Sequence, residues 1–432
     1  MNALILTLFL GGLAACIASG TSVLAALLFG LVCFAGQALL QGHGLHALAG
    51  MMWSGVRTIG HILCLFALIG LLTGVWRAAG TIPCIIHLAL PLVDPSYFLL
   101  WAFVLCSGMS LLLGTSFGTV STLGVICMLL ARAAGLDEGP VAGAILSGIY
   151  VGDRCSPLSS SAALVSALTR TSLYDNIRLM WRTAALPLGL SCLAYGLLSP
   201  SGNAPVTSAI SDTLEQHFVL NGWTLLPALC VIALSLLRVA VKKVMLVSIV
   251  LGVLICLLVQ RLPLEEVLRC LVLGYASRPG TEMLAGGGLV SMASVGGIVL
   301  LASSYAGILE ATGLLRGLRQ AHAWLANRLG RVRATVLASI PLSAISCNQT
   351  LAIILVHQLC SPAHSNRSEM AMVLENSAVL VSVLIPWSIA GSVPCAALGV
   401  DASCLPYAWY LYLVPLLTVL WPAWMTGRRQ GI

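Results

Sequence analysis

The sequence predicts an all-α polytopic membrane protein, and three observations lead to this prediction. Hydrophobic residues make up 59% of the 432 residues and charged residues only 8%, and the mean hydropathy is +1.01. This fraction of charged residues is too small to solvate the surface of a water-soluble domain. Long apolar runs follow one another with short connections. At roughly 20 apolar residues per crossing, the length allows about ten to thirteen transmembrane segments and no large soluble domain.

The apolar runs place these segments in chain order. Before the midpoint they cover residues 3–18, 22–40, 58–76, 82–93, 97–130, 141–168 and 179–198. After it they cover residues 223–239, 244–259, 289–309, 334–359, 370–400 and 405–425. The run at 3–18 has no basic leader and passes directly into a second apolar run, so we interpret it as a first span and not as a signal peptide. The run at 82–93 contains two prolines and is either re-entrant or part of a tilted helix.

Charge and cysteine usage exclude other classes of protein. The net charge of +7 comes mostly from arginines in short loops, which is an orientation signal and not a nucleic-acid surface. The positive-inside rule places the basic loop 316–333 and the basic C-terminal tail in the cytoplasm. The 15 cysteines are scattered and form no C-x-x-C, so we expect buried thiols and neither disulfides nor a metal site. No cofactor is implied.

The chain divides at its only long polar connection, residues 199–221. Residues 158–164 (LSSSAAL) align with 374–380 (LENSAVL), and residues 74–80 (GVWRAAG) align with 307–313 (GILEATG). We therefore predict a first transmembrane half at 1–198, a linker at 199–221 and a second half at 222–432. Repeats of this kind, often inverted, place corresponding broken helices face to face at the membrane midplane.

The stretch from Gly143 to Ser166 is the strongest functional signal. An apolar half-helix runs into Gly-Asp-Arg-Cys-Ser-Pro and resumes with serines. Backbone that leaves a helix inside a bilayer is tolerated only where protein or a water-filled cavity surrounds it. Transporters commonly bind their ligand at such breaks. Similar interruptions occur at 114–119, at 346–350, around 375–376, and at Pro386 and Pro394.

Asp153 is the sharpest candidate, because an acid in a span must be paired, hydrated or neutral and can carry a proton or a cation. The structural alternative is an ion pair with the adjacent Arg154. Glu375 has the same two readings, as a carrier or as a buried carboxyl bonded to a neighbouring helix. The other predicted ligands carry hydroxyl or amide oxygens: Thr115, Ser116, Ser156, Ser159, Ser160, Ser161, Asn348, Gln349, Asn376 and Ser377. For Ser156, Ser159, Ser160 and Ser161 an equally good interpretation is that they are small residues that let helices pack closely.

A hydrolase is the alternative from another class. Residues 114–118 match the G-x-S-x-G pattern with Ser116 as the nucleophile. That pattern requires a strand-to-helix turn, a histidine base and an orienting carboxylate. Here it interrupts an apolar helix, so we expect no enzyme.

A series of motifs runs along the chain: GLLTGVWRAAGTIP (70–83), DPSYFLLWAF (94–103), GTSFGTVSTLGV (114–125), VAGAILSGIYVGDRCSPLSSSAAL (141–164), YAGILEATGLL (305–315), NQTLAIIL (348–355), LENSAVLVSVLIPWSIAG (374–391) and LGVDASCLPYAW (398–409). Together these motifs resemble the NhaC-type sodium/proton antiporter family. The resemblance covers most of the chain. It implies a secondary transporter of the bacterial inner membrane that exchanges sodium for protons, and relatives of this type exchange organic anions.

Two departures from the family pattern fall at the predicted site. Ser160 and Asn376 stand where the resemblance leads us to expect acids, whereas Asp153 and Glu375 match. A site with fewer carboxylates suits an organic solute that brings its own carboxylate. The sequence therefore leaves two transport hypotheses, cation/proton antiport and proton- or sodium-coupled movement of a small organic anion or amino acid. The partners are the bilayer, the transported solute and protons; assembly as a homodimer stays open.

Overall fold

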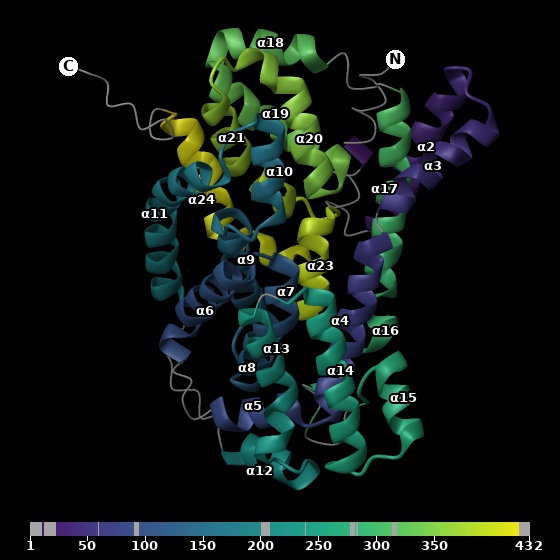
Figure 1. Cartoon of the computed structure of the whole chain (residues 1–432), viewed down its shortest axis with the longest axis vertical. Coiled ribbons are helices and arrows are strands. Elements are labelled where there is room, and N and C mark those ends of the chain that lie inside the picture. Colours follow the sequence, from purple (N-terminus) through teal and green to yellow (C-terminus); the bar gives the residue numbers. More distant parts are fainter. Residues whose placement is uncertain are drawn as a thin grey trace.

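The structure is a computed structural model, and it describes residues 11–12, 23–58, 60–89, 95–199, 208–237, 239–276, 281, 284–312 and 318–422. Most of the predicted first span at 3–18 and the basic C-terminal tail lie outside these residues. Helices dominate the described chain, and its β pairing is one bridge between Tyr275 and Gly286. The fold class predicted from the sequence is confirmed. Figure 1 shows an elongated bundle with α18 at one end of the long axis and α12 at the other.

The helices before the polar midpoint follow in this order: α2 (Val23–Leu40), α3 (Leu45–Thr58), α4 (Gly60–Ala78), α5 (Thr81–Ala89), η2 (Pro95–Tyr97), α6 (Phe98–Leu113), α7 (Ser116–Thr119), the π-helical turn η3 (Val120–Gly124), α8 (Val125–Ala133), α9 (Glu138–Cys155), α10 (Ser160–Thr169) and α11 (Leu173–Leu198). The predicted linker contains one helix, α12 (Ser208–His217).

The remaining helices are η4 (Gly222–Leu225), α13 (Leu226–Leu236), α14 (Val241–Leu258), α15 (Leu264–Leu273), α16 (Gly288–Ser291), α17 (Ala293–Thr312), α18 (Leu318–Leu329), α19 (Arg331–Ser346), α20 (Gln349–Cys360), η7 (Ser361–Ala363), α21 (Arg367–Asn376), α22 (Ala378–Val381), η8 (Ser382–Leu384), α23 (Ile389–Leu398), η9 (Ala402–Tyr407) and α24 (Trp409–Leu420).

Helices from the two parts of the sequence pack against each other. Helix α17 lies along α2 and α3, and α4 packs against α14, α15 and α16. Helix α24 contacts α9 and α11 from the first part and α19 and α22 from the second. The division into two repeated halves stays a prediction.

Broken helices are the common theme of the bundle. Within the described residues, two helices are long and apolar enough to cross a membrane: Ser116–Ala133 and Val241–Leu258. Two further pairs pass the same test only as bent units: Leu63–Ala78 with Thr81–Leu88, bent by 64°, and Arg367–Leu384 with Ile389–Leu398, bent by 52°. Other apolar runs form helices of 10–17 residues. The expected ten to thirteen crossings are therefore not established by helix length.

Most predicted interruptions are present as helix ends. Gly114 ends α6 with φ +66°, and Cys347 ends α19 with φ +53°. Residues 156–159 separate α9 from α10, and Ser377 separates α21 from α22. The prediction of a break at Pro394 is wrong, since this proline lies inside α23. A proline leaves the carbonyl four residues earlier without its helical donor. Here that carbonyl belongs to Ala390 and accepts the Tyr150 hydroxyl at 2.5 Å, so the helix continues.

Helix α9 approaches α6 through two glycines spaced as Gly-x-x-x-Gly. A Cβ atom on Gly148 would lie 2.7 Å from the Phe103 carbonyl oxygen, and one on Gly152 would lie 2.0 Å from the Ser110 carbonyl carbon. Small residues at this spacing let two backbones meet in a membrane. The Ser110 hydroxyl also donates to the Ile149 carbonyl of α9. The contact fixes the helix that carries Asp153.

Gly152→Ala is expected to destabilise the protein by about 1–3 kcal/mol, because the added methyl overlaps the α6 backbone and the helices must separate. The matched control is Gly189→Ala in α11, where an added Cβ meets nothing within 4 Å. That variant should gain about 0.5–1 kcal/mol from helix propensity. Thermal midpoints of the purified proteins in detergent would measure both changes. Equal midpoints for the two variants would contradict the close α6–α9 contact.

Candidate functional site

Three of the helix breaks are closed by side chains that cap the next helix. Thr115 caps α7 by accepting from the Gly118 amide at 3.3 Å. Ser159 caps α10 by accepting from the Ala162 amide at 3.2 Å, and Asn348 caps α20 by accepting from the Thr350 amide at 2.9 Å. Threonine, serine and asparagine are favoured caps because their side-chain oxygens satisfy free amides at a helix start. These breaks are therefore built features of the fold.

Two of the three breaks pack on each other, and the third is tied to the start of α23. A Cβ atom on Gly114 would lie 2.5 Å from the Leu158 Cβ, so the α6–α7 break packs directly on the α9–α10 break. The Ser156 hydroxyl donates to the Leu111 carbonyl at 2.8 Å. The Cys347 carbonyl accepts from the Ile389 amide at 2.9 Å, which ties the α19–α20 break to the start of α23.

A cavity of about 220 Å³ lies where these breaks meet. Six residues predicted for the site line it: Thr115, Ser116, Asp153, Ser160, Asn348 and Gln349. Its remaining walls include Leu65, Phe117, Val241, Ile389 and Ala390. The cavity thus gathers three separate stretches of the sequence around one carboxylate, with hydroxyl and amide groups beside apolar walls. Among the described lining residues, Asp153 is the one that carries a charge.

Asp153 faces the cavity from the last turn of α9 and is 4% exposed. Gln349 donates through Nε2 to the Asp153 carboxylate at 3.1 Å and to the Val379 carbonyl at 3.0 Å. No ion pair between Asp153 and Arg154 occurs in the part of the chain that the structure describes. The structural alternative drawn from the sequence, a local Asp153–Arg154 pair, is therefore wrong, since consecutive helical residues point in different directions.

Three of the predicted serines support the backbone. The Ser159 and Ser161 hydroxyls both donate to the Asp153 carbonyl, the latter at 2.7 Å. Ser156 reaches the Leu111 carbonyl, as described above. All three hydroxyls thus donate to backbone carbonyls, and none of the three serines is among the described residues that line the cavity. Ser160, by contrast, is exposed and lines the cavity, so it stands where the cavity opens.

Glu375, Asn376 and Ser377 are not among the described residues that line the cavity. Glu375 is fully buried, and neither of its carboxyl oxygens has a hydrogen-bond partner. The predicted alternative for Glu375, a carboxyl bonded to a neighbouring helix, is not what the structure shows. Asn376 accepts from Arg154 and donates to the Thr418 hydroxyl at 3.0 Å. The Ser377 hydroxyl donates to the Val373 carbonyl at 2.6 Å.

The sequence did not single out Arg154 as a site residue. Its side chain crosses to partners 29, 222 and 256 positions away: Thr183, Asn376 and Tyr410. No local pattern encodes contacts at these separations. The signal that was available is the charge itself, because an arginine inside an apolar span requires buried acceptors.

The hydrolase alternative is not supported by the surroundings of Ser116. The G-x-S-x-G stretch lies between helices α6 and α7 and not at a strand-to-helix turn. No histidine is among the described residues that line the cavity beside Ser116. Among the described residues, the cavity beside Ser116 therefore offers no histidine base for nucleophilic attack.

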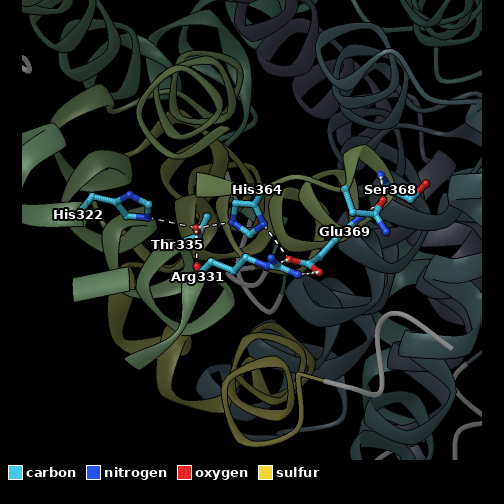
Figure 2. A network of polar contacts seen from close by, with 7 residues as sticks. His322, Arg331, Thr335, His364, Ser368 and Glu369 are labelled. Carbon is cyan, nitrogen blue, oxygen red and sulfur yellow. Dashed lines mark hydrogen bonds and ion pairs between the residues drawn. The ribbon is translucent and has the colours of Figure 1, made fainter. Parts of the chain in front are cut away.

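A second polar cluster lies at the end of the bundle near α18 (Figure 2). Arg331 donates to both Glu369 carboxylate oxygens, at 2.6 and 3.0 Å. His364 lies 2.9 Å from Glu369 through Nδ1 and 2.9 Å from the Thr335 hydroxyl through Nε2. His322 reaches the same hydroxyl at 3.3 Å. The cluster ties α18, α19, the turn after η7 and α21 together.

Acid is expected to weaken this cluster. Burial lowers the pKa of His364 and outweighs the opposing effect of the Glu369 carboxylate. Burial and the neighbouring His364 also lower the pKa of His322. Both rings bind protons more weakly when folded than when unfolded, so stability falls as the pH drops below about 6.5.

The melting temperature at pH 5.5 should therefore lie below that at pH 7.5. In His364→Gln this drop should shrink by about 2 °C. His46→Gln, at an exposed site, is the control and should keep the wild-type drop. If His364→Gln shows the same fall in melting temperature as the wild type, His364 is not a source of the acid sensitivity.

Comparisons with known proteins show the family of the chain. The sequence profile of the family described as "Na+/H+ antiporter family" matches residues 2–198 and 148–424. The Na(+)/H(+) antiporter NhaC of Alkalihalophilus pseudofirmus is 29% identical over 82% of this chain and 80% of its own length. The protein of the same name from Bacillus subtilis is 30% identical over 83% of each.

A third relative carries a different name. The malate-2H(+)/Na(+)-lactate antiporter of Bacillus subtilis is 27% identical over 82% of this chain and 79% of its own length. All three relatives are named as antiporters and none as an enzyme. The family profile matches far more than half of the chain. The chain is thus a multi-pass membrane transporter and belongs to the Na+/H+ antiporter family.

Proposed function

We propose that this chain exchanges sodium, or another small monovalent cation, for protons across the bacterial cytoplasmic membrane. The observation that carries the proposal is the cavity at three helix breaks, in which the carboxylate of Asp153 lies among hydroxyl and amide oxygens. Hard cations prefer such oxygen ligands. One carboxylate offsets one positive charge, so cation and proton compete for Asp153. The bacterial origin of the relatives supports the location.

Within this proposal the lining residues divide by role. Asp153 carries the cation and the proton in turn, and Gln349 orients its carboxylate. Thr115, Ser116, Ser160 and Asn348 offer oxygens to a partly dehydrated ion. The cavity of about 220 Å³ has room for the cation together with a few waters.

A second candidate is the exchange of a small organic anion, and two observations favour it. Helices α10 and α20 both begin at the cavity, with Ser160 and Gln349 as first residues. Helix starts favour anionic groups. Ser160 also stands where the family resemblance leads us to expect an acid, so the cavity holds less negative charge.

Proton movement in proteoliposomes separates the two candidates. Vesicles with a trapped pH-sensitive dye and an imposed proton gradient would be challenged with sodium, lithium, potassium, small carboxylates and amino acids. Collapse of the gradient by sodium or lithium supports cation exchange. Collapse by one organic solute, with no response to any cation, overturns it and moves the chain to the second candidate. Protein-free vesicles and vesicles with heat-inactivated protein are the controls.

A further inference from the structure

Arg154 is a buried charge that is held by neutral oxygens. Its side chain is 0% exposed. Its terminal nitrogens donate to the Asn376 amide oxygen, to the Thr183 hydroxyl at 2.5 Å and to the Tyr410 hydroxyl at 3.1 Å. No carboxylate lies within 4.0 Å of the guanidinium in the described part of the chain, and its Nε has no hydrogen-bond partner. Buried charges are usually paired, so this arrangement is incomplete.

Glu375 is the complementary case, an acid that lacks a donor. It precedes Asn376 in α21, is 0% exposed, and neither carboxyl oxygen accepts a hydrogen bond. It nevertheless interacts electrostatically with both Arg154 and Asp153. A carboxylate with no donor is costly in such a place, so the neutral acid is the form that fits this arrangement.

The two incomplete groups define a second arrangement. When Glu375 loses its proton to a water molecule, its O–H bond breaks and the carboxylate keeps the electron pair. That carboxylate can then accept from Arg154, whose Nε is free to donate. Glu375 and Asn376 are consecutive in α21 and their side chains point in different directions, so the guanidinium has to swing from the amide oxygen to the carboxylate.

We propose that Arg154 is a positioning residue for proton coupling: it serves as the counter-ion of Glu375 when Glu375 is deprotonated, and Asn376 holds it when Glu375 is protonated. This inference rests on the proposed exchange of cations for protons. Asp153 still carries the cation and a proton in turn, and the inference assigns a further proton to Glu375. Because Asp153 and Glu375 repel each other when both are ionised, a cation on Asp153 removes that repulsion and favours proton release from Glu375. Cation binding is thereby coupled to proton release, as the exchange of a cation for a proton requires.

The position of the two groups connects this step to the helix breaks. Arg154 follows Asp153 at the end of α9, and Glu375 and Asn376 are the last residues of α21 before the break at Ser377. When the Arg154 guanidinium changes its partner from Asn376 to Glu375, it shifts the end of α9 relative to the end of α21. Proton release and the geometry of the cation site are thereby linked.

Asn376→Asp separates the proposed counter-ion role of Arg154 from a general requirement for acidic residues in the site. A carboxylate at residue 376 would pair permanently with Arg154, because the amide oxygen already accepts from it. Glu375 would then lack its counter-ion and keep its proton. A general need for more acid in the site predicts the reverse, namely stronger sodium coupling in this variant.

Infrared difference spectroscopy on the reconstituted protein tests the proposal. The carbonyl band of a protonated carboxylic acid, assigned as Glu375 by its loss in Glu375→Gln, should disappear in wild-type protein as the pH is raised. In Asn376→Asp and in Arg154→Gln the pH of half-loss should rise by about one unit or more. Arg154→Lys keeps the charge and should stay within about half a unit of wild type. If Arg154→Gln does not fold, the comparison of Asn376→Asp and Arg154→Lys with the wild type still tests whether Arg154 is the counter-ion of Glu375.

Two results would overturn the inference: a wild-type spectrum without a band that Glu375→Gln removes, or a band whose pH of half-loss is the same in Asn376→Asp as in wild type. The pH titration needs no transported ion. If sodium drives no proton movement in vesicles but the band responds to residues 154 and 376 as expected, the proposed cation fails and the proton-coupling role of Arg154 stands.

Discussion

Asp153→Asn is expected to lower cation-driven proton flux by about 100-fold or more. Asparagine has nearly the same shape and preserves an acceptor for Gln349, but it holds neither a proton nor a compensating charge. Removing the charge partner of a poorly hydrated ion costs about 3 kcal/mol or more, and each 1.4 kcal/mol is a factor of ten. Initial rates of gradient collapse in proteoliposomes, at matched protein content, would measure the loss.

The control for this variant is Asp401→Asn. Asp401 is exposed and caps η9 by accepting from the Ser403 amide at 2.9 Å. Asparagine caps a helix as well as aspartate does, so this change removes the same charge and spares the fold. We expect wild-type flux from Asp401→Asn. Retention of more than half of the flux in Asp153→Asn would remove Asp153 from the centre of the mechanism.

Ser160→Asp is expected to raise the apparent affinity for sodium by about tenfold. The exposed Ser160 side chain lines the cavity that Asp153 faces, so the new carboxylate adds charge where a cation enters. An attraction of about 1 kcal/mol between the new carboxylate and the cation through water corresponds to several-fold tighter binding. If the two charges are partly desolvated, the attraction and the gain in affinity are larger. The same variant should repel an organic anion, whose apparent affinity would fall.

Ser166→Asp is the matched control, because Ser166 lies further along α10 and donates to the Ala163 carbonyl without lining the cavity. The concentration of sodium that gives half-maximal gradient collapse would be compared among wild type, Ser160→Asp and Ser166→Asp. A fall for Ser160→Asp alone supports the cation site. Equal values for all three would show that the transported ion does not pass residue 160.

The two departures from the family pattern separate once the structure is considered. From the sequence, Ser160 and Asn376 formed one argument about a less acidic site. In the structure, Ser160 faces the cavity and Asn376 faces Arg154. Spacing along the chain could not reveal this difference, because it depends on which side of α21 meets the end of α9.

Local chemistry explains which parts of the fold were predictable. The breaks at Gly114 and Asn348 follow from a glycine with positive φ and from a capping side chain, both legible in a few residues. The course of α23 through Pro394 was not predictable, since it depends on a hydroxyl from Tyr150, which is 240 positions away from Ala390. The cavity was anticipated because polar residues in apolar spans must converge. The partners of Arg154 were not, because polar acceptors are scattered along the whole chain.

The close approach of α6 and α9 at Gly148 and Gly152 has a consequence for how the transporter changes its access between the two sides of the membrane. Helices whose backbones are in contact resist sliding past each other, so we expect Asp153 to stay fixed relative to α6. We therefore expect the opening and closing surfaces on the opposite wall, where Gln349 begins α20 and Ile389 begins α23. Gln349 donates both to Asp153 and to the Val379 carbonyl, so it bridges the fixed wall and the wall that we expect to move. We expect it to lose one of these two hydrogen bonds when the cavity opens to the other side of the membrane.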